Sequence, residues 1–124
     1  MKYMLLVYGD ENALTQAERE ACYGESAAYA RKLSAEGHYL DAAPLHSVAT
    51  ATSVRVRDGK HSVTDGPFAE TREQLGGYYL IEAKDLDEAI RAAAGIPGAR
   101  FGTVEIRPIV EIEGLPPERS KEKI

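Results

Sequence analysis

The chain has 124 residues, of which 44% are hydrophobic and 28% charged, with a formal net charge of −5 at pH 7. This length and balance indicate one globular domain with a single core rather than a disordered chain. The negative charge argues against a nucleic-acid partner, because phosphate binding requires an excess of Lys and Arg on one face. The lone cysteine, Cys22, cannot form an intramolecular disulfide and indicates a reducing compartment.

The first expected strand is the apolar run at residues 3–8, whose composition is typical of a strand covered on both faces. This run is too short for a signal peptide or a membrane span, so we expect a cytoplasmic protein without a membrane partner. Thr15 and Glu18 then form a capping box that starts a helix.

The helix that follows is expected to end at Gly37, a residue type that tolerates the left-handed conformation. Arg19 and most other charged residues of this helix are expected on its outer side. The inner stripe follows helical spacing and contains Cys22, Ser26, Tyr29 and Leu33.

The middle of the chain reads as β structure. Residues 38–45 predict a short strand that is either an edge strand or a bulged one, because Pro44 cannot donate a hydrogen bond to a neighbour. Residues 53–57 and 60–64 predict a hairpin around the type I′ turn Asp58-Gly59. A two-residue turn determines the register, and it places four side chains on one face: Val54, Val56, His61 and Val63.

The last elements are a strand at residues 77–83, a helix capped by Asp85 and a strand at residues 103–112. The predicted inner stripe of this second helix contains Leu86, Ala89, Ile90 and Ala93. We therefore expect one domain over residues 1–112. Residues 113–124 are rich in Pro and charge, and predict a flexible C-terminal tail or a dimer arm.

The order β-α-β-(ββ)-β-α-β predicts an α+β fold, a ferredoxin-like split βαβ with an added β-hairpin. In this fold two helices cover one face of an antiparallel sheet. If the other face carries apolar side chains, it must be buried against something else. A second copy of the chain is the simplest partner, so we expect a homodimer.

The stretch at residues 65–77 is a long polar connection in which Asp65, Glu70 and Glu73 follow one another closely. Such carboxylates can supply a general acid and a general base with separated pKa values. They can equally chelate a hard cation, or Asp65 can cap local amides while the glutamates are solvated. The residues alone leave these alternatives open.

The run TDGPFAETREQLGGYYLIEAKDLDEA, the opening YMLLVYGDE and the later IPGARFGTVEIRPI resemble the DGPF branch of the YCII-related family. The resemblance extends from residue 1 to about residue 112, and the DGPF tetrapeptide is its most specific part. It implies a dimeric α/β barrel. Shorter relatives carry a His on the first helix that is suspected of pairing with an Asp as a catalytic dyad. Ser26 stands at that His position here, and Asp10 best matches the acid.

Several further residues are candidates for ligand binding. His61 and Asp65 share a strand face but lie about 13 Å apart by strand rise, so a ligand or partner chain would have to bridge them. Tyr79 belongs to the core or orients a ligand, and Arg107 meets an acidic ligand or pairs with Glu105. The histidines lack metal-binding spacing, so we expect no metal site and no cofactor.

Two functions remain open from the sequence. The first is a small-molecule enzyme with a ligand in the dimer cavity, where Asp65 and Glu73 transfer protons and Asp10 assists. Its ligand would be bound by Glu70, Tyr79, Arg107 and His61. The alternative is a non-catalytic ligand-binding or regulatory module. The resemblance links that alternative to sigma-factor-dependent transcription.

Overall fold

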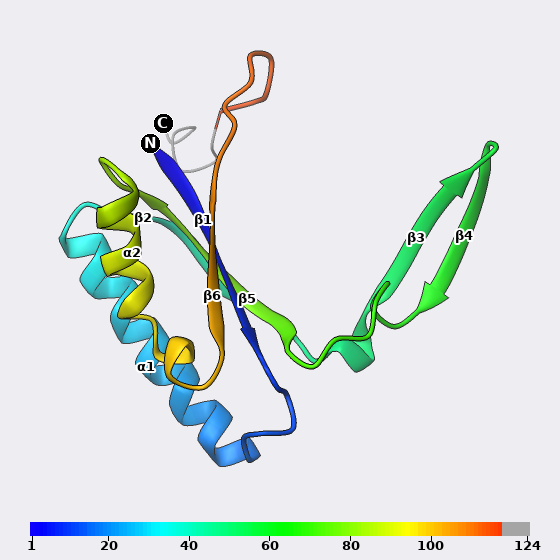
Figure 1. Ribbon diagram of the computed structural model, residues 1–124, viewed down its shortest axis with the longest axis horizontal. Helices are drawn as coiled ribbons and strands as arrows, with labels where there is room; N and C mark the ends of the chain where they lie inside the picture. The colour runs from blue at the N-terminus through cyan, green and yellow to red at the C-terminus, as the bar shows by residue number, and fades with distance from the viewer. Residues whose placement is uncertain (118–124) are drawn as a thin grey trace.

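The computed structural model describes residues 1–117 (Figure 1). Its strands and helices are, in chain order, β1 (Lys2–Gly9), α1 (Gln16–Ala35), β2 (Tyr39–Pro44), β3 (Thr52–Arg57), β4 (Lys60–Asp65), β5 (Gln74–Glu82), α2 (Leu86–Ala94) and β6 (Thr103–Pro108). Two short 3-10 helices, η1 (Val48–Thr50) and η2 (Pro97–Arg100), follow β2 and α2. Within residues 1–117, no helix is long and apolar enough to cross a membrane.

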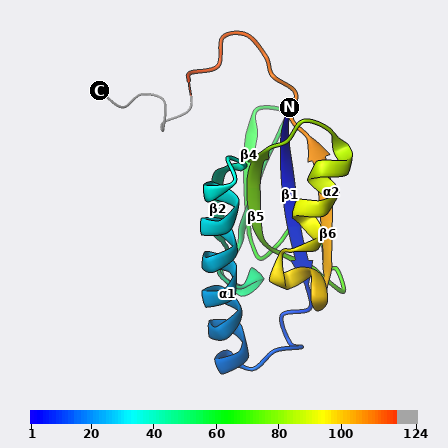
Figure 2. The same cartoon turned by 90° about the vertical axis from the view of Figure 1, so that its left-hand side faces the viewer.

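The main sheet has the strand order β2-β5-β1-β6, and all its neighbours are antiparallel. This is the order of a ferredoxin-like split βαβ, so the predicted fold class is confirmed. Both helices lie on the same face of the sheet, as Figures 1 and 2 show. We call this helix-covered side the inner face and the opposite side the outer face.

The core lies between the inner face and the two helices. Alternation along β1 directs Tyr3 and Leu5 inward, where they are 3% and 0% exposed. Their cross-strand neighbours on β5 are Ile81 and Tyr79, which are also buried. From α1, Leu33 completes this core at 1% exposure.

The second helix departs from its predicted stripe. Leu86 and Ile90 are 52% and 47% exposed, whereas the buried side of α2 is made by Ala89, Ala92 and Ala93. Because alanines are small, α2 packs close to the sheet on them, and its larger apolar side chains turn outward.

The two ends of α1 have the capping features that the sequence predicts. Thr15 Oγ accepts a hydrogen bond from Glu18 N at 3.1 Å, and Glu18 Oε1 accepts one from Thr15 N at 2.9 Å. This reciprocal pair is the predicted capping box. Gly37 has a φ of +82°, as expected of a glycine that follows a helix.

The hairpin of β3 and β4 has the predicted register and turn. Val56 pairs with His61 and Val54 with Val63, and both turn residues, Asp58 and Gly59, have positive φ. The hairpin forms a two-stranded sheet of its own and projects away from the main sheet (Figure 1). Its three valines are 53–66% exposed, so their face is uncovered by the rest of residues 1–117.

Two predicted strand limits were wrong. The strand expected at residues 77–83 begins earlier, at Gln74, because β1 continues to Gly9 and pairs with it across a bulge. The last strand ends at Pro108 and not at residue 112. Its neighbour in the sheet is β1, which begins at Lys2. Because Pro108 already pairs with Tyr3, β1 offers almost no further residues for β6 to pair with.

Residues 109–117 contain no helix or strand, and Val110 and Ile112 are 79% and 59% exposed. The predicted tail at residues 113–124 lies outside the described residues from residue 118 onward. Its role as a flexible tail or a dimer arm therefore stays a prediction.

Candidate functional site

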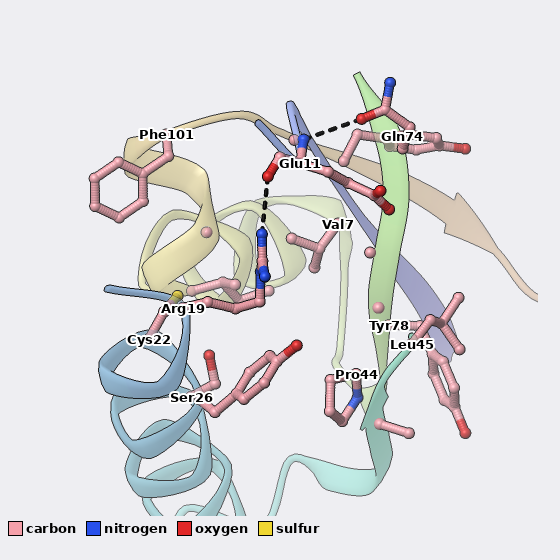
Figure 3. Close-up of a pocket in the computed structure, with 18 of the residues that line it drawn as sticks. Val7, Glu11, Arg19, Cys22, Ser26, Pro44, Leu45, Gln74, Tyr78 and Phe101 are labelled. Atoms are coloured by element: carbon pink, nitrogen blue, oxygen red, sulfur yellow. Dashed lines mark hydrogen bonds between the residues drawn. The ribbon is translucent and has the colours of Figure 1, made fainter. Parts of the chain in front are cut away.

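A cavity of about 810 Å³ opens between the N-terminal half of α1 and the inner face of the sheet. We call it the α1 cavity (Figure 3). Residues from several elements line it: the α1 residues Cys22, Ser26, Ala27 and Ala30, the strand residues Val7, Ala42, Gly77 and Tyr79, and, after α2, Ile96, Gly98 and Phe101. Residues 10–14 and 44–47 surround its mouth.

The cavity exists because small residues face one another across this part of the fold. Ala27 and Ala30 of α1 and Ala42 and Gly77 of the sheet all line the cavity. A Cβ atom on Gly77 would stand 2.9 Å from the carbonyl oxygen of Ala43, so the close pairing of β2 with β5 requires glycine there. Further along α1, large side chains fill the same layer.

Glu11 makes hydrogen bonds to several of the segments that surround the mouth of the cavity. Its carboxylate accepts hydrogen bonds from Ser47 Oγ at 2.8 Å and Val48 N at 2.9 Å. Its backbone N–H donates to Gln74 Oε1 at 3.0 Å, and its carbonyl oxygen accepts from the Arg19 guanidinium at 2.8 Å. Figure 3 shows the last two bonds. Through this one residue, the loop after β1 is joined to α1, η1 and β5.

Tyr79 is the one predicted ligand-binding residue that lines the α1 cavity. Its hydroxyl donates to the carbonyl oxygen of Ser26 at 3.1 Å, and its ring meets Tyr29 edge-on with centroids 6.3 Å apart. Burial raises the pKa of Tyr79 above its usual value of 10.0. The phenol therefore stays protonated at neutral pH and acts as a hydrogen-bond donor.

Asp10 is the one predicted catalytic residue that lines the cavity. It follows β1 directly and lies exposed at the mouth. One carboxylate oxygen, Oδ1, accepts a hydrogen bond from Asn12 N at 2.9 Å. Its second oxygen is the one available to a ligand.

The other predicted catalytic residues lie elsewhere. Asp65 is exposed at the end of β4, opposite Thr52 at the base of the hairpin. Glu73 lies just before β5, where its carboxylate accepts a hydrogen bond from Thr103 Oγ at 2.9 Å. Neither belongs to the lining of the α1 cavity, and their catalytic roles stay predictions.

The remaining predicted ligand-binding residues are also outside the cavity. Glu70 is exposed in the connection before β5, and His61 is exposed on the hairpin. Arg107 lies 3.7 Å from Glu105, the surface pair that the sequence offered as the alternative. Among residues 1–117, no three His, Cys, Asp or Glu side chains lie close enough together to hold a metal ion.

The sequence reasoning missed Arg19 by placing it on the outer side of the helix. Arg19 is half-buried and lines the cavity. Its position was readable from spacing, because residues 19, 22 and 26 continue the inner stripe at intervals of three and four. Because charged residues usually lie on the solvent side of a helix, the charge of Arg19 led to its prediction on the outer side.

Comparisons with known proteins agree with the fold. Uncharacterized protein R00369 of Rhizobium meliloti (strain 1021) is 38% identical over 114 residues, covering 88% of this chain and 92% of that relative. A solved structure, 5-chloro-2-hydroxyhydroquinone dehydrochlorinase (TftG) from Burkholderia phenoliruptrix AC1100 in complex with 2,5-dihydroxybenzoquinone, superposes with a TM-score of 0.55. The superposition covers 91% of this chain and 97% of TftG at 15% identity, which establishes a shared fold. The sequence model of the YCII-related domain matches residues 1–113, and the chain therefore belongs to the YCII-related domain family.

Proposed function

We propose that the chain binds a small molecule in the α1 cavity and acts on it by acid–base chemistry. The observation that carries this proposal is the cavity itself. Its volume of about 810 Å³ lies within the range of about 300–1,000 Å³ that is typical of small-molecule sites. Like such sites, it combines mainly apolar walls with a few polar groups.

Asp10 is the group proposed for proton transfer, and Tyr79 is the group proposed to orient the ligand. The Asp10 carboxylate at the mouth accepts a proton from the ligand, and the Tyr79 hydroxyl in the wall, whose own proton goes to the Ser26 carbonyl oxygen, accepts a hydrogen bond from it. A general base at the mouth and an orienting hydroxyl in the wall can act on one ligand. The structural neighbour TftG, a dehydrochlorinase solved in complex with 2,5-dihydroxybenzoquinone, is an example of this fold used by a small-molecule enzyme.

We also propose that the chain forms a homodimer through the outer face and the hairpin. The outer face carries half-buried Met4, Leu6 and Leu80, which neighbour one another across β1 and β5. An isolated two-stranded hairpin is marginally stable in water, so the exposed valine face of β3 and β4 needs a cover. Asp65 and Glu73 do not line the α1 cavity of their own chain. In a dimer, they could reach an α1 cavity only if it belonged to the other copy.

The dimer is tested by size-exclusion chromatography with light scattering on the wild type, Val56→Asp and Ser62→Asp. Val56 lies on the valine face, whereas Ser62 pairs with Arg55 on the opposite face. We expect a dimer for the wild type and Ser62→Asp, and a monomer for Val56→Asp. A wild type that is monomeric at micromolar concentration overturns the proposal.

The DGPF tetrapeptide at residues 65–68 supports assignment to the DGPF branch of the family. Its exposed position at the base of the hairpin suits a role in assembly better than one in the α1 cavity.

The site is tested by thermal-shift screening of small metabolites against the wild type, Ser26→Phe and Asp65→Asn. Ser26→Phe fills the cavity from α1, whereas Asp65→Asn changes the other candidate region. A ligand at 100 times its Kd stabilises the fold by about 2.7 kcal/mol. We expect this stabilisation to vanish in Ser26→Phe and to persist in Asp65→Asn. Stabilisation that persists in Ser26→Phe and vanishes in Asp65→Asn would instead place the ligand near Asp65, outside the α1 cavity.

Catalysis is tested on the compounds that bind. Each is incubated with the wild type and with Asp10→Asn, and its conversion is followed by mass spectrometry. Conversion by the wild type that is lost in Asp10→Asn supports acid–base chemistry. Binding without conversion favours the non-catalytic alternative.

A further inference from the structure

We infer that Arg19 makes the α1 cavity selective for small carboxylates that carry an apolar ring or chain. This inference rests on the proposed function, because it names the class of ligand that the cavity binds.

Arg19 reaches the cavity from the second turn of α1. It is half-buried, and one guanidinium nitrogen donates to the carbonyl oxygen of Glu11 at 2.8 Å. Figure 3 shows its side chain extending from α1 toward Glu11, on the same side of the helix as Cys22 and Ser26. A guanidinium has five N–H donors in a planar fork. The bond to Glu11 therefore leaves donors for a ligand and holds the fork in place.

The charge of Arg19 has no carboxylate partner among residues 1–117. Arg100 and Arg107, by contrast, pair with Glu25 at 2.9 Å and Glu105 at 3.7 Å. A cation that is partly withdrawn from water without a counter-charge is unfavourable. A ligand carboxylate would remove this penalty, and its two oxygens match the guanidinium fork.

The two acidic residues of the cavity lining do not substitute for such a ligand. The Glu11 carboxylate is bound by Ser47 Oγ and Val48 N, and Asp10 accepts from Asn12 N. Both lie in the loop at the mouth, and both use at least one oxygen to hold that loop. The Arg19 fork therefore faces the ligand without competition from a paired acid.

The walls determine the rest of the ligand. Aliphatic and aromatic side chains line the same cavity as Arg19, among them Val7, Ala27, Ala30, Ile96 and Phe101. Burial of apolar ligand surface against them is favourable at roughly 25 cal/mol per Å². The cavity thus joins one cationic anchor to an apolar chamber. An amphipathic carboxylate has this shape and polarity.

The experiment compares matched ligand pairs by isothermal titration calorimetry. Each pair is a carboxylate and its uncharged amide, for example benzoate with benzamide and phenylacetate with phenylacetamide. On the wild type, we expect each carboxylate to bind about 10- to 100-fold more tightly than its amide, the difference typical of a charge-assisted hydrogen bond. This comparison requires no substitution.

Three variants then assign the preference to Arg19. Arg19→Gln is expected to equalise the two members of each pair, and Arg19→Lys to keep part of the preference because it retains the charge but not the fork. Arg31→Gln removes a charge from an exposed position on the same helix, so it is expected to behave as wild type. Circular dichroism and Tm confirm that each variant is folded.

The outcomes separate this inference from the proposed function. Amides that bind as tightly as carboxylates, with both lost in Ser26→Phe, overturn the anion preference and leave the cavity as a binding site. A preference that survives in Arg19→Gln overturns the role of Arg19. Binding that Ser26→Phe does not affect, or no binding by any probe, overturns the proposed function together with the inference.

Discussion

Buried Tyr79 and half-buried Tyr29 allow binding in the α1 cavity to be tested separately from the stability of the fold. Tyr79 donates to the carbonyl oxygen of Ser26 at 3.1 Å, and Tyr29 donates to that of Ala92 at 2.6 Å. Each phenylalanine substitution keeps the ring and removes one hydrogen bond, at a cost of about 0.5–1.5 kcal/mol. For a chain of this length the cost corresponds to a decrease in Tm of about 2–6 °C. Differential scanning calorimetry should show a similar decrease for both variants.

Of these two tyrosines, Tyr79 lines the cavity and Tyr29 does not, so Tyr79→Phe should affect a ligand and Tyr29→Phe should not. Loss of one neutral hydrogen bond weakens binding by about 2- to 10-fold. Calorimetric titration with a ligand from the screen should show this for Tyr79→Phe, and wild-type affinity for Tyr29→Phe. Equal effects of the two substitutions, or no effect of Tyr79→Phe, would refute the assignment of the Tyr79 hydroxyl to the site.

A second prediction for the same variants concerns how Tm depends on pH in the alkaline range. Burial raises the pKa of Tyr79 and of Tyr29 in the folded state, above the value of 10.0 for an exposed phenol. The folded protein therefore keeps protons that the unfolded chain loses above about pH 10. This stabilisation is present below that pH and is lost as pH rises through the folded pKa. The Tm of the wild type should fall more steeply than that of either variant between pH 9 and pH 11. Parallel curves would contradict the pKa assignment.

Three further predictions concern packing, and each is checked by urea denaturation. Leu33→Ala should lower the free energy of unfolding by about 2.7–5 kcal/mol, because this side chain is 1% exposed in the core. Gly24→Ala should raise it by about 0.5–1 kcal/mol, since Gly24 lies inside α1 with open space around the new methyl group. Gly102→Ala should be strongly destabilising, because its Cβ would overlap the carbonyl oxygen of Tyr8 and force β1 to move. An unchanged midpoint for Leu33→Ala or Gly102→Ala, or a lower one for Gly24→Ala, would contradict the packing described.

Local features were predictable because they depend on residues close together in the chain. The capping box of Thr15 and Glu18 needs only four consecutive residues, and the structure contains it. The hairpin register likewise follows from the two-residue turn at Asp58-Gly59. The continuous apolar run at residues 3–8 was sufficient to predict the first strand.

Strand limits were less predictable because they depend on partners distant in sequence. The apolar pattern through Ile112 suggested a longer last strand, yet β6 stops where β1 no longer provides a neighbour. In the same way, β5 starts at Gln74 because the end of β1 lies beside it. The polar residues before Gly77 gave no sign of this pairing.

The sequence by itself determined the elements, their order, the family and the fold, since periodicity, caps and turn residues act over short distances. Only the tertiary structure decided the site. It brings Asp10 from the loop after β1, Arg19 from α1 and Tyr79 from β5 together around one cavity, and it leaves Asp65 and Glu73 outside that cavity. The cavity arises where small residues of α1 and of the sheet oppose one another, so it depends on which residues face each other after folding. The spacing of residues along the chain does not show which of them will face each other after folding.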